Sequence, residues 1–422
     1  MEGFLVRGGE KIYGEMRVDT AKNAVLPILA AAILPNGQTL LKNCPAISDV
    51  ESMRGILQTL GCKTEWTDDG LIVHGEMLDN GEMPEHLSKK VRSSIFLLGP
   101  ILAKLRRATM VYPGGCEIGL RPIDLHLSGL RRMGVIIREE GGVLHCDGSN
   151  MHAADVHLDY PSVGATENVM MSAVLLDGIT TITNAAREPE IEDLQHYINA
   201  MGGSVQGAGT HTIVVKGVQS LHGGVYEPMP DRIVAGTYLC AAAMTGGAVT
   251  LRNARPRDMK AVLEKLTEMG CVLRKEENLI ALAAPCRLKA FHQVQTQPYP
   301  GFPTDMQSQF LALATAAKGS SVVIENVFEN RFALVGDLSR MGADIRVSGR
   351  AAFVQGVEKL QGAQVHARDL RAGAALVLAA LRAEGETVIR DVQFIDRGYE
   401  KMEERLSALG ADIRRIRTED VT

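Results

Sequence analysis

Aromatic residues are scarce in this chain, and long apolar runs are absent. Only 4% of the 422 residues are Phe, Trp or Tyr, while 43 are Gly and 45% are hydrophobic, which favours tightly packed helices and many turns. The longest apolar stretches, 24–34 and 372–381, fall well short of the ~20 residues that a bilayer span needs, so we expect no membrane insertion. The first residues do not resemble a signal peptide, and seven cysteines without CxxC spacing fit a reducing compartment. We therefore expect a cytoplasmic protein.

A basic surplus and the common catalytic motifs are missing too. The formal net charge of -5 argues against a general nucleic-acid binder, because phosphate-backbone affinity needs a basic surface. No GK dipeptide, HExxH, GxSxG or GxGxxG occurs, which removes the usual signatures of P-loop kinases, zinc hydrolases, serine hydrolases and dinucleotide oxidoreductases. Asp and Glu do not cluster at metal-ligand spacing. We expect chemistry that uses protein cations, a thiol and carboxylates, with no metal and no cofactor.

One sequence pattern occurs six times along the chain: an amphipathic stretch that ends in Leu or Met, then Gly, then a short strand-like run. Each Gly lies where a helix needs a left-handed C-terminal cap. A helix of small residues and a β-branched run precede each copy, which predicts six repeats of αβαβ type. The six glycines are Gly61, Gly134, Gly202, Gly270, Gly342 and Gly410.

The sixth repeat stops at residue 417 and lacks the apolar phrase that closes three of the other copies. Residues 4–8, Phe-Leu-Val-Arg-Gly, carry that missing pattern at the opposite end of the chain. We infer that the amino-terminal strands complete the sixth repeat. The fold class is then α/β with two domains of three repeats, 22–229 and 1–21 joined to 230–422, and a cleft between two lobes commonly binds a ligand.

Cationic residues recur at the helix entrances of these repeats. Helix amino termini attract anions, and an Arg or Lys there adds formal charge. Each cation could equally be solvated or paired with a nearby carboxylate, but the repeated slot favours a polyanionic ligand. The slot before the second helix holds Arg121, Arg187, Arg255 with Arg257, Arg331 and Arg397, and the slot that opens the first helix holds Lys22, Lys90 with Arg92, Arg232 and Arg371.

Two departures from the repeat carry more information. The segment 112–122 is enlarged, contains three glycines and one thiol, and looks like a mobile lid. Cys116 within it is flanked by Gly and close to Arg121, which suits acid–base or nucleophilic work, whereas the other six cysteines are interpreted as small core residues. Asp305 places a carboxylate in a slot that is otherwise mostly cationic. It is either a helix N-cap or a base that accepts a hydroxyl proton, and both interpretations stay open at this point.

With these residues in view, the sequence resembles the enolpyruvyl transferase family, and within it the UDP-N-acetylglucosamine 1-carboxyvinyltransferases. The likeness runs essentially from end to end. It rests on the motifs AKNA at 21–24, PGGC at 113–116 continuing to RPID at 121–124, SVGAT at 162–166, PGFPTD at 300–305, ENR at 329–331, ARDLR at 367–371 and DRGY at 396–399.

The resemblance implies two inside-out α/β barrels of three repeats each, which close over the ligands. It implies transfer of the enolpyruvyl group of phosphoenolpyruvate to the 3′-hydroxyl of UDP-N-acetylglucosamine with release of phosphate, the first committed step of peptidoglycan precursor synthesis. These two small molecules are the expected partners. Because cationic charge develops at carbon, an acid, a base and anion clamps must coexist in the site.

The resemblance also assigns residue roles. Cys116 would be the general acid and could bond covalently to phosphoenolpyruvate, and Asp305 would be the base for the 3′-hydroxyl. Lys22 and Arg397 would assist catalysis, while Arg331 and Asp369 would support the site. The expected phosphoenolpyruvate ligands are Lys22, Asn23, Arg121, Arg371 and Arg397. The expected UDP-sugar contacts are Arg92, Arg121, Pro122, Ile123, Asp124, Leu125, Tyr160, Pro161, Ser162, Val163, Asp305 and Val327.

Two competing functions are weighed against this one. The sister 3-phosphoshikimate enolpyruvyl transferase would share the fold and the donor, but the Cys116 loop and the motif at 162–164 argue against it. A catalytically silent paralogue could bind the sugar nucleotide as a sensor. The presence of Lys22, Cys116, Asp305 and Arg397 argues against that alternative.

Overall fold

The structure is a computed structural model that describes residues 2–114, 118–119 and 122–417. The chain forms two compact domains. The terminal domain comprises Met1–Asp19, Cys116–Arg121 and Pro230–Thr422, and the central domain comprises Thr20–Gly115 and Pro122–Met229. Within the described part, no helix combines the length and apolar character that a membrane crossing requires. The predicted first boundary lies after residue 21 and leaves the Cys116 loop in one domain, whereas Ile118 groups with the terminal domain, where its carbonyl accepts from Asn330 N–H at 3.0 Å.

Three buried helices form the centre of the terminal domain: α8 (Arg232–Thr245), α10 (Gln307–Ala316) and α12 (Leu370–Arg382). They pack on one another, and every residue of α8 and α10 is buried. Small residues permit this close approach, since a Cβ at Gly236 would lie 2.8 Å from the Met306 side chain. The α8 helix begins where the Asp231 carboxylate accepts the N–H groups of Ile233 and Val234, both at 2.8 Å.

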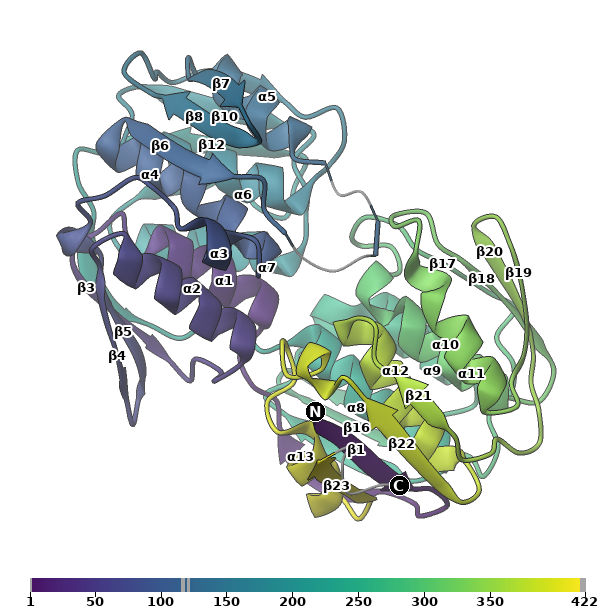
Figure 1. Ribbon diagram of the computed structural model, residues 1–422. Helices are drawn as coiled ribbons and strands as arrows, with labels where there is room; N and C mark the ends of the chain where they lie inside the picture. The colour runs from purple at the N-terminus through teal and green to yellow at the C-terminus, as the bar shows by residue number, and fades with distance from the viewer. Residues whose placement is uncertain (1, 115–117, 120–121, 418–422) are drawn as a thin grey trace. The chain divides into compact units, whose positions relative to one another are not determined.

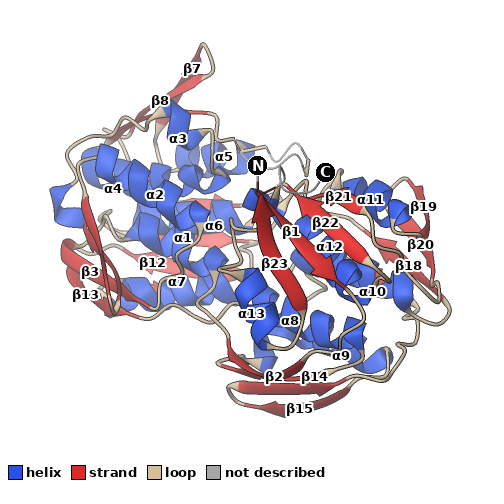
Figure 2. Cartoon of the chain, turned by 60° about the horizontal axis from the view of Figure 1, so that its bottom comes forward, coloured by secondary structure: helices blue, strands red, loops and turns tan. Residues whose placement is uncertain are grey.

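Three four-stranded sheets surround these helices, so strands lie outside and helices inside (Figures 1 and 2). The sheet orders are β15-β16-β14-β2, β17-β18-β20-β19 and β21-β22-β1-β23. The strands are β1 (Glu2–Arg7), β2 (Tyr13–Arg17), β14 (Ala248–Arg252), β15 (Val272–Glu276), β16 (Leu279–Ala283), β17 (Gln293–Gln295), β18 (Ser320–Ile324), β19 (Asp344–Ser348), β20 (Ala351–Gln355), β21 (Gln364–His366), β22 (Glu386–Arg390) and β23 (Asp412–Arg417).

The first strand completes the sixth repeat, as predicted. β1 pairs antiparallel with β22 on one side and with β23 on the other, and its Phe4 and Val6 side chains are fully buried. The second strand differs from the prediction. β2 pairs in parallel with β14, in register from Tyr13–Ala248 to Arg17–Arg252, so it serves the fourth repeat. The amino-terminal segment therefore supplies one strand to each of two sheets.

The central domain repeats this plan around its own core helices: α1 (Lys22–Ala31), α4 (Leu98–Leu105), which continues the 3-10 segment η2 (Arg92–Leu97), and α6 (Val163–Ala173). The sheet orders are β13-β3-β5-β4, β11-β12-β10-β9 and β6-β8-β7. The strands are β3 (Asn36–Lys42), β4 (Lys63–Thr67), β5 (Gly70–His74), β6 (Arg107–Val111), β7 (Ile136–Glu140), β8 (Val143–Asp147), β9 (Asp155–His157), β10 (Ile179–Thr183), β11 (Ser204–Gln206), β12 (Thr212–Lys216) and β13 (His222–Tyr226).

The six repeated glycines follow the outer helices and confirm the predicted caps. Their φ angles lie between 86° and 97°, the left-handed region in which Gly is favoured. These helices are α2 (Ser48–Thr59), α5 (Asp124–Arg132), α7 (Pro189–Ala200), α9 (Lys260–Glu268), α11 (Val335–Arg340) and α13 (Met402–Ala408). The remaining short helices are α3 (Glu85–Ser88), η1 (Gly75–Met77), η3 (Pro256–Met259), η4 (Thr304–Met306), η5 (Arg331–Leu334) and η6 (Val392–Phe394).

Because β1 is an inner strand, its buried face should stabilise the terminal domain. Phe4→Ala should lower the free energy of unfolding by about 3–5 kcal/mol, since it leaves a cavity in a packed core. Arg7→Ala is the control, because Arg7 forms only an exposed ion pair with Glu386 and should leave stability nearly unchanged. Urea unfolding followed by circular dichroism measures both, and an equal change in the two variants would contradict the structural role of the buried face.

Candidate functional site

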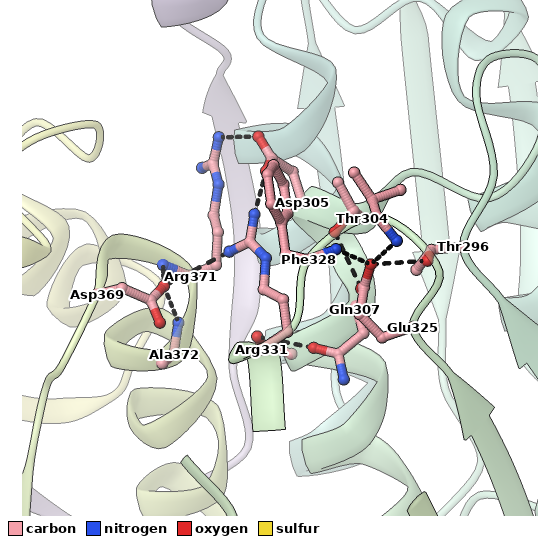
Figure 3. A network of polar contacts seen from close by, with 12 residues as sticks. Thr296, Thr304, Asp305, Gln307, Glu325, Phe328, Arg331, Asp369, Arg371 and Ala372 are labelled. Carbon is pink, nitrogen blue, oxygen red and sulfur yellow. Dashed lines mark hydrogen bonds and ion pairs between the residues drawn. The ribbon is translucent and has the colours of Figure 1, made fainter. Parts of the chain in front are cut away.

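Asp305 is the centre of a charged cluster in the terminal domain. It lies in η4, one turn before α10, and its two carboxylate oxygens accept from two different arginines (Figure 3). Arg331 Nη2 donates to Oδ1 at 2.8 Å, and Arg371 Nη2 donates to Oδ2 at 2.9 Å. The arginine side chains are only 3% and 4% exposed, whereas the Asp305 side chain is 24% exposed. Two buried cations therefore hold a carboxylate that solvent can reach.

The capping interpretation of Asp305 is wrong. The N-cap of η4 is Pro303 and that of α10 is Met306, and neither makes a side-chain capping bond. The Asp305 carboxylate turns instead to Arg331 and Arg371, because ionic hydrogen bonds are stronger than neutral ones. Asp305 is therefore held by two ion pairs rather than by a helix-capping bond.

Asp369 provides the cap that Asp305 does not. Its Oδ1 accepts the N–H groups of Arg371 and Ala372 at 2.8 and 3.0 Å, which starts α12. The same oxygen lies 3.6 Å from Arg331 Nη1. The structure thus brings together four residues that the sequence analysis selected from three separate motifs: Asp305, Arg331, Asp369 and Arg371.

The environment of Arg371 keeps it cationic. Burial lowers the pKa of its guanidinium, but the charge of Asp305 and the hydrogen bond to it outweigh that effect, so the pKa is raised overall. Arg371 Nη1 also donates to the Tyr399 hydroxyl at 3.3 Å, and its guanidinium lies 5.7 Å from the centre of that ring. Burial in turn raises the pKa of Tyr399. The tyrosine therefore stays a neutral partner near pH 7.

Glu325 belongs to this cluster and was missed by sequence reasoning. It directly follows β18, is 1% exposed and accepts hydrogen bonds from the segments that carry Thr304 and Phe328 (Figure 3). A signal for it exists in the repeats. The residue before the strand-end Asn is Lys42, Thr183 or Arg252 in other copies, and only in the fifth copy is this residue acidic. Val327, an expected UDP-sugar contact, donates its N–H to Glu325 Oε1 at 2.7 Å.

In the central domain, Lys22 opens α1 and pairs with a carboxylate that sequence reasoning also missed. Its Nζ lies 2.8 Å from Asp49 Oδ2, in the first turn of α2, and the Lys22 side chain is 12% exposed. Asn23 follows it as a half-buried residue. Lys22, like Arg331 and Arg371, forms an ion pair with a nearby acid. The sequence left this pairing open as the alternative to binding of an anionic ligand.

Two further predicted segments of the central domain are neighbours. Pro122, Ile123, Asp124 and Leu125 lead into α5, and Tyr160, Pro161, Ser162 and Val163 lead into α6. The helices α5 and α6 pack together, and a Cβ at Gly164 would lie 2.9 Å from the His126 ring. Ser162 caps α6 by accepting the Ala165 N–H at 3.4 Å. Pro122, Asp124 and Tyr160 are exposed. The starts of α5 and α6 therefore present a carboxylate and an aromatic ring to solvent.

The structure shows fewer contacts for the remaining predicted site residues among those that it describes. Arg92 opens η2 and donates to the Pro113 carbonyl at 3.2 Å, at the start of the enlarged segment. Arg397 is half-buried in the turn after η6, and its neighbour Asp396 accepts two bonds from Arg415, at 2.6 and 2.9 Å. Cys116 and Arg121 lie outside the described residues. Among the residues that are described, no group of three or more His, Cys, Asp or Glu could hold a metal ion.

Comparison with known proteins identifies the family to which this chain belongs. The family model described as EPSP synthase (3-phosphoshikimate 1-carboxyvinyltransferase) matches residues 6–406. The chain belongs to the enolpyruvyl transferase family. This enolpyruvyl transferase is 50% identical over 416 residues to "UDP-N-acetylglucosamine 1-carboxyvinyltransferase 2" of Caldanaerobacter subterraneus subsp. tengcongensis, with 99% of this chain and 100% of the relative covered. It is 48% identical to "UDP-N-acetylglucosamine 1-carboxyvinyltransferase 1" of Symbiobacterium thermophilum, with 98% and 95% covered.

Solved structures confirm the predicted fold class. The enolpyruvyl transferase NikO from Streptomyces tendae superposes with a TM-score of 0.88 at 23% identity, with 98% of each chain covered. EPSP synthase from Acinetobacter baumannii gives a TM-score of 0.76 at 19% identity, with 99% of this chain and 100% of that chain covered. These two likenesses concern the fold alone.

The described cysteines of this enolpyruvyl transferase differ in exposure. Cys44, Cys62, Cys146, Cys240 and Cys271 are buried, as expected for core residues. Cys286 is exposed, so its interpretation as a core residue is wrong. It follows Pro285 in the turn after β16, where the chain leaves the sheet and the side chain has no core to enter.

Burial should protect most of these thiols from alkylation. It raises the pKa of Cys62 and Cys271 to about 12 and that of Cys146 to about 11, and it also raises the pKa of Cys240 well above its ordinary value. Only the thiolate is nucleophilic, so at pH 8 these groups are protonated and should react slowly with iodoacetamide. Time-resolved mass spectrometry should find Cys286 modified well before these four. Early modification of any of the four in the folded protein would contradict their burial.

Proposed function

We propose that this enolpyruvyl transferase moves the enolpyruvyl group of phosphoenolpyruvate to the 3′-hydroxyl of UDP-N-acetylglucosamine and releases phosphate. The observation that carries the proposal is the name shared by relatives that are 45–50% identical over nearly the whole chain. The reaction would be the first committed step of peptidoglycan precursor synthesis, in the cytoplasm. It serves cell-wall growth and hence cell shape and division.

On the acceptor side, Asp305 accepts the proton of the sugar 3′-hydroxyl. Its partly exposed carboxylate supports this role, because a base must be reachable by its substrate. Arg371 has two tasks in the proposal, since it is also an expected ligand of phosphoenolpyruvate. The guanidinium has five N–H donors, and the side-chain bonds to Asp305 and Tyr399 use two of them, so other donors of Arg371 can serve a substrate anion. A substrate anion that binds Arg371 shares its positive charge, which weakens the effect of Arg371 on Asp305 and makes Asp305 a better proton acceptor.

On the donor side, Lys22, Asn23, Arg121, Arg371 and Arg397 hold the phosphate and carboxylate of phosphoenolpyruvate. Fixed ammonium and guanidinium groups neutralise these anions, so the reaction needs neither metal nor cofactor. The pair of Lys22 with Asp49 supports this assignment, because it orients the Lys22 side chain in a largely buried position.

Protonation of the donor falls to Cys116 in this proposal. The thiol gives its proton to the methylene carbon, which becomes a methyl group, while the hydroxyl oxygen attacks the neighbouring carbon and gives its proton to Asp305. Phosphate then leaves as the methyl carbon loses a proton, which forms the carbon–carbon double bond of the product again. Cys116 also forms a covalent adduct with phosphoenolpyruvate. The contacts to UDP-N-acetylglucosamine come from Arg92, Arg121, residues 122–125 and 160–163, Asp305 and Val327.

Acceptor choice tests the proposal directly. Incubation with phosphoenolpyruvate and UDP-N-acetylglucosamine should release inorganic phosphate, and incubation with phosphoenolpyruvate and 3-phosphoshikimate should not. A colorimetric phosphate assay measures both reactions. Release with 3-phosphoshikimate alone would replace the proposed acceptor. Tight sugar-nucleotide binding in titration calorimetry, with no phosphate from either acceptor over hours, would favour the sensor alternative.

The role of Cys116 predicts a large kinetic effect. Cys116→Ser should lower kcat near pH 7 by about 10²–10⁴-fold, because a hydroxyl is a far weaker acid than a thiol. Cys286→Ser is the matched control and should keep wild-type activity, since this exposed thiol lies outside the proposed site. Fosfomycin, the epoxide inhibitor of the resembled family, should alkylate Cys116, as peptide mass spectrometry would show. A wild-type rate in Cys116→Ser, or alkylation of another cysteine instead, would remove the acid role.

A further inference from the structure

Glu325 is a buried carboxyl group with four donors from three separate segments. Its Oε1 accepts from Thr296 Oγ1 at 2.9 Å, from the Val327 N–H at 2.7 Å and from the Phe328 N–H at 3.1 Å. Its Oε2 accepts from Thr304 Oγ1 at 3.0 Å. Within the described residues, no Lys or Arg forms an ion pair with it. A buried polar group held this completely by neutral donors fixes the geometry of everything bonded to it.

The segments joined at Glu325 are those that carry the acceptor-side residues (Figure 3). Thr304 immediately precedes Asp305, so the bond to Oε2 sets the backbone from which the Asp305 carboxylate projects. The two backbone bonds to Oε1 set the turn that contains Val327 and Phe328. Glu325 therefore connects Val327 with Thr304, the residue next to Asp305, although Asp305 and Val327 are 22 positions apart in the sequence.

A second route leads from Glu325 to the same carboxylate. The Phe328 ring lies under the Arg331 guanidinium, with 5.0 Å between the guanidinium carbon and the ring centre. Arg331 in turn donates to Asp305 Oδ1 at 2.8 Å. Glu325 thus acts on Asp305 from two sides, through Thr304 and through the Phe328–Arg331 stack. These two sets of contacts together restrain both the position and the direction of the Asp305 carboxylate.

We propose that Glu325 is a positioning residue for the acceptor substrate, which holds Asp305 and Val327 at a fixed separation so that the sugar hydroxyl meets the base. This inference rests on the proposed function. It predicts that loosening Glu325 affects the use of UDP-N-acetylglucosamine and leaves the binding of phosphoenolpyruvate intact. A small misplacement of a catalytic group commonly costs up to about 10²-fold in rate.

The test compares Thr304→Val with Thr304→Ser, because these side chains differ in the hydroxyl that reaches Oε2. Thr304→Val should lower kcat with UDP-N-acetylglucosamine by about tenfold and leave the KM for phosphoenolpyruvate within about twofold of wild type. Thr304→Ser keeps the donor and should restore kcat to within about twofold. Melting temperatures recorded for each variant separate kinetic from structural effects.

Glu325→Gln and Glu325→Ala form a second pair. The Gln carbonyl can accept the bonds now made to Oε1, and its amide can donate to Thr304 Oγ1, so it should retain more activity than Ala. Glu386→Gln is the matched control, because Glu386 is the exposed first residue of β22, and it should behave as wild type. If Thr304→Val and Glu325→Ala melt earlier but keep wild-type kcat and both KM values, Glu325 is merely structural and the proposal is overturned. A rise of the phosphoenolpyruvate KM as large as the loss in kcat would overturn it as well.

The wild-type protein in the same assay separates the two claims. If it releases phosphate with UDP-N-acetylglucosamine while the variants match it in kcat and KM, only the role of Glu325 fails. If the wild-type protein releases no phosphate with this acceptor, the proposed function fails, and the role of Glu325 in positioning that acceptor fails with it.

Discussion

The burial of whole helices is the constraint on which this structure depends. In the terminal domain, α8, α10 and α12 bury nearly all of their residues, so polar side chains concentrate at the helix ends. Asp231 and Asp369 cap two of these helices, and Asp305 precedes the third. Since a buried Arg needs a carboxylate partner, the acids and cations at these ends meet. The charged cluster is therefore a consequence of the packing that forms the core.

The repeats made much of this architecture predictable. Six glycine caps and the closure of the sixth repeat by β1 follow from local patterns, which do not depend on distant residues. Pairings between repeats were harder to predict. The strand β2 could have joined either neighbour, and its parallel pairing with β14 depends on where the chain runs after β1. The repeat pattern predicts where a strand lies in the sequence, but it does not specify which strand pairs with it.

The candidate site shows the same difference between local patterns, which could be predicted, and long-range contacts, which could not. Sequence motifs selected Lys22, Asp305, Arg331 and Arg371, yet Asp49 and Glu325 remained unnoticed because each acts through residues that are distant in the sequence. A carboxylate next to a strand or in a first helical turn looks ordinary until its donors are known. For Asp305, the choice between cap and reactive group required the positions of two arginines, 26 and 66 residues away.

The place of β1 between β22 and β23 has a consequence for the order of folding. A ribosome makes this strand before the other strands of the terminal domain, and it makes the two partners about 380 and 410 residues later. The central domain, Thr20–Met229 apart from the segment Cys116–Arg121, has its own core and all its strands long before that moment. Vectorial synthesis therefore allows the central domain to fold during translation, while the terminal domain must keep an apolar strand unpaired until β22 and β23 have been made.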